Sequence, residues 1–274
     1  MWSPVVCRCM SGDPSTNASG PEGTPTIKSV ETSHRIVAAL EAMGPATVTE
    51  VAAEADLSKG GAYKHLKTLE GTDFVVREGN EYRLGLRFLD LGGKLRYDYP
   101  HSQTIKDSVQ QLAQATGETA LYTVLEADRT TTLFRERGPN GVSTRTRIGK
   151  RLYPHETAAG KCILSQLSPE AVDDVFGDGP LPEVTEHTIT DRDALDDELA
   201  RVAERGYAYN LGESVEGLVA IAAPLVPDDA VLGACSVTGP YHRLKGDPLD
   251  AELTETLLSF VNELELNIAH ANTP

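Results

Sequence analysis

The order of the elements predicted for residues 29–92 constrains the fold more than any other feature of the chain. Three short segments with helical periodicity come first, and a hairpin pattern and a glycine-led apolar helix follow. Ser29 is the expected N-cap of the first helix, and Gly44-Pro45 is its expected stop. Five apolar residues of this segment fall mostly on one helical face: Val30, Ile36, Val37, Leu40 and Met43.

The second and third helices carry clear start signals. Thr47 is the expected cap of the second helix, and Glu50 three residues later completes a capping box. Ser58 is the expected cap of the third helix, where four residues fall at core spacing: Ala62, His65, Leu66 and Leu69. The sequence FVVREGNEYRLG then predicts two strands joined by a tight turn at Gly79-Asn80. These elements together predict a winged helix-turn-helix over residues 26–84.

The polar face of the third helix has the properties that a DNA major groove requires. It offers hydrogen-bond donors near the N-terminal half of the helix, where such helices meet base edges. The DNA-binding residues predicted on this helix are Ser58, Lys59, Gly60, Gly61, Tyr63, Lys64 and Lys67. Arg77 and Arg83 flank the tip of the hairpin and suit contacts to the DNA backbone or minor groove. The alternative interpretation is a helical packing domain with solvated lysines, in which Tyr63 packs on the hairpin.

Charge is distributed unevenly along the chain. Residues 26–99 carry a net charge of −1, whereas residues 100–274 carry −14 of the total of −16. This acidity makes non-specific binding of the whole molecule to phosphate implausible, but local docking by the near-neutral head remains open. The pI of about 4.8 also suits a cytoplasm rich in salt.

The first 25 residues predict a disordered leader, because they are rich in Ser, Gly, Pro and Thr. Pro4 and Arg8 interrupt a very short apolar stretch at the start, which therefore does not read as a signal peptide. Met10 is an alternative start of translation, and its use would remove Cys7 and Cys9. Because no run of about 18 apolar residues occurs, we expect no membrane span.

The four cysteines predict neither a disulfide framework nor a zinc site. No second pair and no histidine cluster follows Cys7 and Cys9, and Cys162 and Cys235 lie inside apolar segments. We therefore expect no metal, no cofactor and a reducing cytoplasm as the compartment.

A linker helix and a larger domain follow the predicted head. Residues 85–99 predict an apolar linker helix, which can pair with its twin or act as a lever. Within residues 100–274, helices are predicted at IKDSVQQLAQATG, HETAAGKCILSQL, DRDALDDELARVAERG and DAELTETLLSFVNELELNIAHA. Strands are predicted at TALYTVLEA, TTTLFRERG, LVAIAAPLV and AVLGACSVTGP, with turns at Asp128-Arg129 and Pro227-Asp228-Asp229. The expected fold class is α+β, with a helix-flanked antiparallel sheet in the second domain.

The chain resembles the IclR family of bacterial and archaeal transcriptional regulators over residues 27 to about 270. Six pieces in the right order and spacing carry the resemblance: IKSVETSHRIVAALE, LSKGGAYKHLKTLE, EYRLGLRFLDLG, HETAAGKCILSQL, RGYAYNLGESVEGLVAIAAPL and LGACSVTGP. The resemblance implies a GAF-like effector-binding domain at residues 100–274 and a homodimer or homotetramer. It also implies a small-molecule effector and a palindromic operator in double-stranded DNA, in the control of a catabolic operon.

The resemblance also indicates where an effector would bind. Carried over position by position, the effector-binding residues are Ala159, Gly160, Asn210, Ala220, Ser236 and Thr238. Many relatives have an acidic residue at the position of Asn210 and a cysteine at the position of Ala220. Because Asn donates as well as accepts and Ala enlarges a cavity, the effector is expected to be bulkier than a small keto acid, or to be hydrogen-bonded differently.

Each residue near this site also has a purely structural interpretation. His155 and Glu156 would cap the helix that follows them. The hydroxyls of Ser236 and Thr238 would satisfy backbone groups, and the carboxylate of Glu213 would fix a loop. Gly217 would meet a backbone requirement.

Enzymatic activity is not expected from this sequence. It contains no G-x-S-x-G elbow, no H-E-x-x-H motif and no glycine-rich phosphate loop. A sensor that does not bind DNA, or an adaptor that binds only proteins, would fit the acidic body but would leave the third helix unexplained.

Overall fold

The computed structural model describes residues 25–142, 146–177, 179–244 and 251–271. The predicted leader lies outside these residues, apart from its last position, and so do Cys7, Cys9 and Met10. The chain divides into two compact units, with a boundary between Tyr99 and Pro100.

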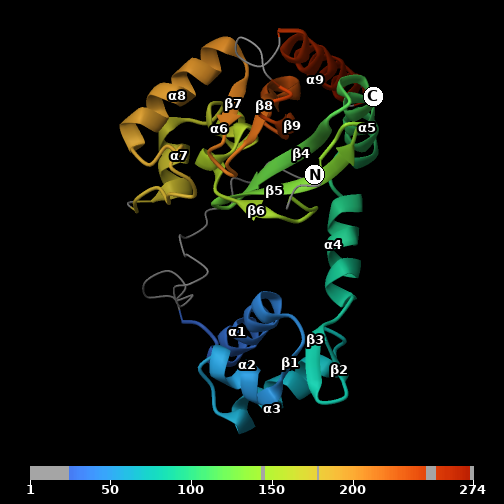
Figure 1. Ribbon diagram of the computed structural model, residues 1–274, viewed down its shortest axis with the longest axis vertical. Coiled ribbons are helices and arrows are strands. Elements are labelled where there is room, and N and C mark those ends of the chain that lie inside the picture. The colour runs from blue at the N-terminus through green and yellow to red at the C-terminus, as the bar shows by residue number, and fades with distance from the viewer. Residues whose placement is uncertain (1–24, 143–145, 178, 245–250, 272–274) are drawn as a thin grey trace. The chain divides into compact units, whose positions relative to one another are not determined.

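The first unit contains a three-helix core and a three-stranded antiparallel sheet (Figure 1). The sheet has the order β1-β3-β2, and β2 and β3 form the predicted hairpin. The elements are α1 (Lys28–Met43), β1 (Ala46–Thr47), α2 (Val48–Glu54), α3 (Lys59–Glu70), β2 (Val75–Glu78), β3 (Glu81–Leu84) and α4 (Arg87–Tyr97). The short strand β1 was not predicted from the sequence.

The predicted caps of α2 and α3 are confirmed. The backbone N–H of Thr47 donates to Glu50 Oε2 at 2.8 Å, and the N–H of Glu50 donates back to Thr47 Oγ1 at 3.4 Å. The Ser58 hydroxyl accepts from the N–H of Gly61 at 3.1 Å. These bonds satisfy backbone donors that have no partner inside the first turn of a helix.

The start of α1 differs from the prediction. The helix already begins at Lys28, so Ser29 lies inside it, and the residue before it, Ile27, makes no side-chain cap. The predicted apolar face is correct at its centre but wrong at its ends, because Val30 is 63% exposed and Met43 is 39% exposed. The buried positions follow a slightly rotated face: Thr32, Ile36, Ala39 and Leu40.

The core of this unit joins all three helices to the hairpin. It is built from Ile36, Ala39, Leu40, Ala46, Val51, Ala55, Leu66, Val75 and Tyr82. His65 was predicted as a core residue but is only partly buried, and its Nδ1 lies 3.0 Å from the hydroxyl of Ser33 on α1. Helix α3 packs on α1, α2 and β2, and the face that carries Lys59, Tyr63 and Lys64 is exposed.

The second unit is built on one six-stranded antiparallel sheet with the order β6-β5-β4-β9-β8-β7. Its strands are β4 (Thr119–Glu126), β5 (Arg129–Arg137), β6 (Arg151–Leu152), β7 (Ala208–Leu211), β8 (Leu218–Leu225) and β9 (Gly233–Pro240). Its helices are α5 (Ser102–Thr116), α6 (Ala158–Leu164), α7 (Pro169–Phe176), α8 (Arg192–Arg205) and α9 (Ala251–Ala271), with 3₁₀ turns η1 (Pro154–Glu156) and η2 (Pro227–Asp229). The α+β prediction is confirmed, although α7 and β7 were not predicted.

Helices cover both faces of this sheet (Figure 1). Helices α5 and α9 pack together on one face, where they contact β4, β5, β8 and β9. Helix α6 lies against the opposite face, and α8 packs on α6. The alanines of α6 meet small residues of the sheet, Ala208, Ala222 and Ala234, so this helix comes close to the strands. Among the described residues, no helix is long and apolar enough to cross a membrane.

Candidate functional site: a DNA-binding surface and an effector site

The exposed face of α3 carries the residues predicted to meet base edges. Ala62 and Leu66 are fully buried, so the opposite face of the helix, with Tyr63 and Lys64, points away from the core. Lys59 and Lys64 are exposed, and Tyr63 is 47% exposed. The arrangement leaves two amines and a phenol, all of which donate hydrogen bonds, on the same side of the helix.

The cations predicted to contact phosphate are already held by neighbours on the protein. Lys67 Nζ lies 2.6 Å from Glu70 Oε2, one turn along α3. Arg83 donates to Glu78 Oε1 from Nε at 2.8 Å and from Nη2 at 2.5 Å. Arg77 Nε donates to the carbonyl of Gly79 at 2.9 Å. These interactions are exposed and have a small net free energy, so phosphate can replace the two carboxylates and the carbonyl at low cost.

The two glycines at the start of α3 have different surroundings. A Cβ built on Gly60 meets nothing within 4 Å, whereas one on Gly61 lies 3.1 Å from the hydroxyl of the cap, Ser58. Among the described residues, no packing contact therefore requires glycine at position 60, although glycine costs a helix roughly 1 kcal/mol relative to alanine.

In the second unit, the register of the sheet brings four of the predicted effector-binding residues onto one face. Asn210 on β7 is opposite Ala220 on β8, and Ala220 is opposite Thr238 on β9. Ser236 lies two residues before Thr238 and therefore shares its face. Ala222, which is opposite Ser236, packs against α6, so this is the face that α6 covers. Ala159 and Gly160 lie on α6 itself.

Gly160 is required by packing inside the protein. A Cβ at this position would lie 2.1 Å from the carbonyl oxygen of Pro154, so a side chain there would push η1 away from α6. Its backbone N–H donates to the hydroxyl of Thr157 at 2.9 Å, which is the side-chain cap of α6. The prediction that His155 and Glu156 cap this helix is therefore wrong.

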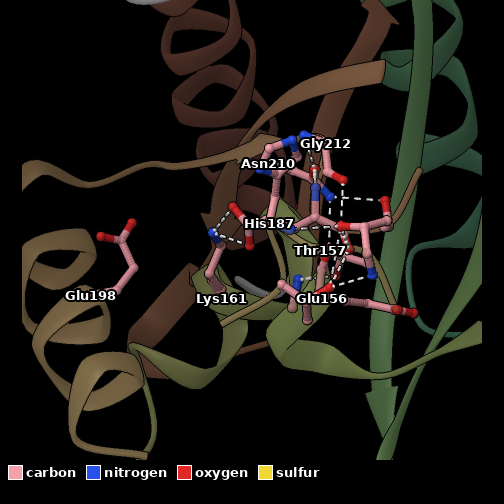
Figure 2. Close-up of polar contacts among 12 residues, drawn as sticks. Glu156, Thr157, Lys161, His187, Glu198, Asn210 and Gly212 are labelled. Carbon is pink, nitrogen blue, oxygen red and sulfur yellow. Dashed lines mark hydrogen bonds and ion pairs between the residues drawn. The ribbon is translucent and has the colours of Figure 1, made fainter. Parts of the chain in front are cut away.

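Asn210 connects η1 to the loop that follows β7 (Figure 2). Its Nδ2 donates to the carbonyl of Glu156 at 2.7 Å and to Ser214 Oγ at 2.9 Å. Its Oδ1 accepts from the N–H groups of Gly212 at 3.0 Å and Glu213 at 2.9 Å. An amide can make four such bonds, so the side chain is saturated by the protein itself. A direct contact between Asn210 and an effector stays a prediction. The four hydrogen bonds instead support a role for Asn210 in positioning η1 and the loop after β7.

A buried ion pair fixes the same loop to α6. Lys161 Nζ lies 2.7 and 2.8 Å from the two carboxylate oxygens of Glu213, and both residues are buried (Figure 2). Thr188 adds a bond from its hydroxyl to the carbonyl of Glu213 at 2.8 Å. The loop-fixing interpretation of Glu213 agrees with this geometry. The partner, Lys161, was missed, although a lysine inside an otherwise apolar helix is a signal that could have found it.

His155 and Glu156 occupy a closed, largely apolar site. His155 is fully buried, its ring lies 5.7 Å from those of Tyr153 and Phe176, and its Nε2 is 2.9 Å from the carbonyl of Pro182. Burial lowers the pKa of His155. Burial also raises the pKa of Glu156 to about 7, although its Oε1 accepts from the N–H of Tyr153 at 3.1 Å.

The hydroxyls on the α6-facing side of the sheet fall into two classes. Thr238 Oγ1 donates to the carbonyl of Val219 at 3.0 Å, which supports the structural interpretation for that residue. Thr119 on β4, opposite Thr238, is fully buried, and its hydroxyl has no partner. Thr119 was not predicted as a site residue, because its place beside Thr238 depends on a pairing between strands far apart in the sequence.

The two units match known protein families separately. The family model for the bacterial transcriptional regulator IclR C-terminal domain matches residues 102–265, and a helix-turn-helix domain model matches residues 31–78. A protein from Halobacterium salinarum, named "Probable HTH-type transcriptional regulator ArcR", is 29% identical over 251 residues, which cover 89% of this chain and 95% of that protein.

Solved structures show the same fold. An IclR transcriptional regulator from Alicyclobacillus acidocaldarius has a TM-score of 0.74 at 24% identity, covering 90% of this chain and 99% of that one. An IclR homolog from Microbacterium hydrocarbonoxydans, complexed with 4-hydroxybenzoate, has a TM-score of 0.71 at 24% identity, covering 88% and 100%. The chain therefore belongs to the IclR family of transcriptional regulators, with a helix-turn-helix unit for DNA and an effector domain.

Proposed function

We propose that this regulator binds a palindromic operator as a homodimer or homotetramer and that a small-molecule effector in the second unit controls this binding. The observation that carries the proposal is the exposed polar face of α3, where Lys59, Tyr63 and Lys64 project from a buried apolar base. A helix with one apolar and one polar face can place hydrogen-bond donors in a major groove while its apolar face packs against the rest of the DNA-binding unit. Because the rest of the molecule is strongly acidic, this face is where DNA can approach.

The assembly is proposed from the apolar surface of α4. None of its residues is buried: Leu89 and Leu95 are 70% and 71% exposed, and Leu86, the N-cap, is 75% exposed. Large apolar side chains gathered on one short helix mark a contact surface. A second copy of α4 is the partner that fits, because a palindromic operator needs two heads about 34–36 Å apart, or a multiple of that spacing.

The effector is proposed to act by changing that spacing. Its site is proposed on the face of the sheet that carries Ser236 and Thr238, beside the start of α6, where Ala159 lies. Coupling requires that the effector bind two arrangements of the assembly with different affinities, typically by about 1–3 kcal/mol. The relatives named above are regulators, which supports control of an operon, and we propose a catabolic one beside the gene for this chain.

We further propose that the protein works in the cytoplasm, without enzymatic activity, in the presence of much salt. The net charge of −14 on residues 100–274 gives carboxylates that repel one another at low ionic strength. The melting temperature should therefore rise as KCl increases from dilute to molar concentration. A flat or falling curve would remove the salt-adaptation proposal and leave the regulator proposal intact.

The test of the regulator proposal is a gel shift with the DNA upstream of the gene for this chain. A shift that resists competitor DNA of random sequence is expected, with two half-sites protected from cleavage by a footprinting nuclease. No shift at any salt concentration would favour the alternative, an adaptor or sensor that does not bind DNA. Turnover of a ligand by the purified protein would instead favour an enzyme.

A further inference from the structure

We propose that Glu70 and Glu78 act as built-in counter-ions of the DNA-binding surface and thereby lower the part of the DNA affinity that does not depend on sequence. The inference rests on the proposed function, because it concerns the cations that are predicted to contact DNA phosphate. It gives a role in DNA binding to two carboxylates that neither the sequence nor the comparisons assign to that surface.

Glu70 is fixed beside Lys67 by the geometry of α3. Residues three positions apart are neighbours on a helix surface, and Lys67 Nζ lies 2.6 Å from Glu70 Oε2. The hydrogen bond from Glu70 raises the pKa of Lys67, so the ammonium stays charged. The carboxylate of Glu70 therefore occupies the place beside this ammonium that a phosphate oxygen would take.

Glu78 holds Arg83 across the hairpin. Val76 is opposite Arg83 in the register of β2 and β3, so Glu78, two residues after Val76, lies diagonally across from Arg83 on the same face. Glu78 Oε1 accepts from Arg83 Nε at 2.8 Å and from Nη2 at 2.5 Å. This edge of the guanidinium, which could bind a phosphate, is therefore occupied by a carboxylate oxygen in the free protein.

The lysines predicted to read base edges have no such counter-ion. Lys59 and Lys64 are exposed, and neither takes part in a salt bridge within the part of the chain that the structure describes. The two kinds of cation on this surface thus differ. Lys67 and Arg83, which are assigned to phosphate, each hold a carboxylate, whereas the two lysines assigned to bases keep their donors free.

Binding of phosphate to Lys67 or Arg83 then exchanges one anion for another. The exchange itself costs little, because an exposed ion pair has a small net free energy. The displaced carboxylate, however, stays attached to a surface that now faces the DNA backbone, and it must take up a cation from solution. Uptake of a cation offsets the release of a counter-ion from DNA, and that release is the source of sequence-independent affinity and of its salt dependence.

The first experiment measures this affinity with a DNA duplex of random sequence. The duplex is titrated into the full chain at several KCl concentrations at which circular dichroism shows a folded protein. Glu70→Gln and Glu78→Gln should each bind more tightly than the parent, and the slope of log affinity against log salt should steepen by about 0.9 for each variant. Over a fourfold range of salt, this change amounts to about 3.5-fold in affinity. Slopes equal to that of the parent would overturn the proposal.

Glu81→Gln is the matched control in the hairpin. Glu81 is opposite Glu78, is exposed and forms no salt bridge with any described residue, so this variant makes the same change in charge without freeing an arginine. Its slope should stay closer to that of the parent than the slope of Glu78→Gln does. If the two variants steepen the slope equally, net charge alone sets the affinity, and the pairing of Glu78 with Arg83 has no role in it.

A double-variant cycle tests whether Glu70 acts through Lys67. Glu70→Gln should tighten binding to random DNA in the parent but change it little in the Lys67→Gln background, because no ammonium is left to be freed. Equal effects in the two backgrounds would show that Glu70 does not act as the counter-ion of Lys67, and the proposal would fall for this pair.

The outcome can be separated from that of the regulator proposal. If the parent shifts its operator but the variants leave the slope unchanged, only the counter-ion proposal fails. If neither the parent nor the variants bind operator or random DNA at any salt concentration, the regulator proposal fails, and the counter-ion proposal fails with it.

Discussion

The backbone N–H of Gly85 donates to the carbonyl of Phe74 at 2.8 Å, and this bond ties the start of α4 to the turn that follows the DNA-facing helix α3. The two segments are in close contact, because a Cβ on Gly85 would lie 2.1 Å from the carbonyl oxygen of Asp73. The rings of Phe74 and Phe88 meet edge to face, with centroids 5.0 Å apart. The start of α4 is therefore packed directly against the turn that follows α3.

Gly85→Ala should break this connection. The added methyl group cannot fit beside the Asp73 carbonyl, so the junction must shift, at a cost of about 1–3 kcal/mol. We expect a lower melting temperature of the first unit and weaker operator binding in gel shifts. Gly92→Ala inside α4 is the control, because its Cβ meets nothing within 4 Å. Equal losses of operator affinity in the two variants would contradict a special role for the junction.

Lys64→Ala should change DNA specificity, whereas Lys67→Ala should not. Loss of a base contact by Lys64 is expected to cost about 1–3 kcal/mol on the operator and little on random DNA. Lys67 is held by Glu70 at 2.6 Å and is predicted to reach only phosphate, so its loss should weaken all sequences alike and reduce the salt dependence. Competition gel shifts at several salt concentrations measure both effects. If Lys64→Ala weakens operator and random DNA equally, the assignment of Lys64 to a base is wrong.

Local chemistry explains why so much of the first unit could be predicted. Three of its features depend only on neighbours within three residues: the caps at Thr47 and Ser58 and the hairpin turn at Gly79-Asn80. Such local patterns can be recognised in the sequence alone. The face of α1 was harder to predict near its start, because the burial of Val30 depends on which part of the helix the other elements contact. The strand β7 was missed because a four-residue edge strand leaves too short a pattern to distinguish from a loop.

The effector site was predictable in its outline but not in its bonds. Family resemblance indicated Asn210, Ser236 and Thr238, and the sheet register places them on one face. Lys161 and Glu213 are 52 residues apart, and no local sequence pattern predicts that they form an ion pair. Thr119 likewise comes to lie beside Thr238 only through the pairing of β4 and β9. Contacts of this kind are set by tertiary packing, which composition and periodicity do not encode.

Lys161→Met should be strongly destabilising, because it leaves the carboxylate of Glu213 buried without its cation. Burial raises the pKa of Glu213, and the ammonium of Lys161 opposes that shift. Removing one partner of such a pair typically costs about 3–5 kcal/mol, whereas replacing both by apolar residues is often nearly neutral. Urea unfolding of Lys161→Met, Glu213→Leu and the double variant measures the cycle. A double variant as unstable as the sum of the single ones would show that the two side chains do not act as a pair.

Glu156→Gln should change how stability depends on pH. The folded-state pKa of Glu156 is about 7, above the ordinary value of 4.5, so the folded protein holds this proton more tightly than the unfolded chain does. The stabilising contribution is therefore complete below about pH 4.5 and is lost as pH rises through 7. Relative to Glu156→Gln, the parent should lose up to about 3 kcal/mol across this range, as 1.36 kcal/mol per pKa unit implies. Parallel stability curves from pH 4.5 to 8 would mean that Glu156 is ionised throughout.

Leu95→Glu should separate the subunits without unfolding them. Leu95 is 71% exposed on α4, so a charge there costs an isolated chain little, but it would be buried in the proposed contact between two copies of this helix. We expect a smaller species in sedimentation equilibrium, an unchanged circular dichroism spectrum and loss of the two-half-site complex with operator. Leu266→Glu on α9 is the matched control, since Leu266 is 60% exposed in the other unit. An assembly that survives Leu95→Glu and dissociates with Leu266→Glu would place the subunit contact on α9 instead, and α4 would then act within one chain only.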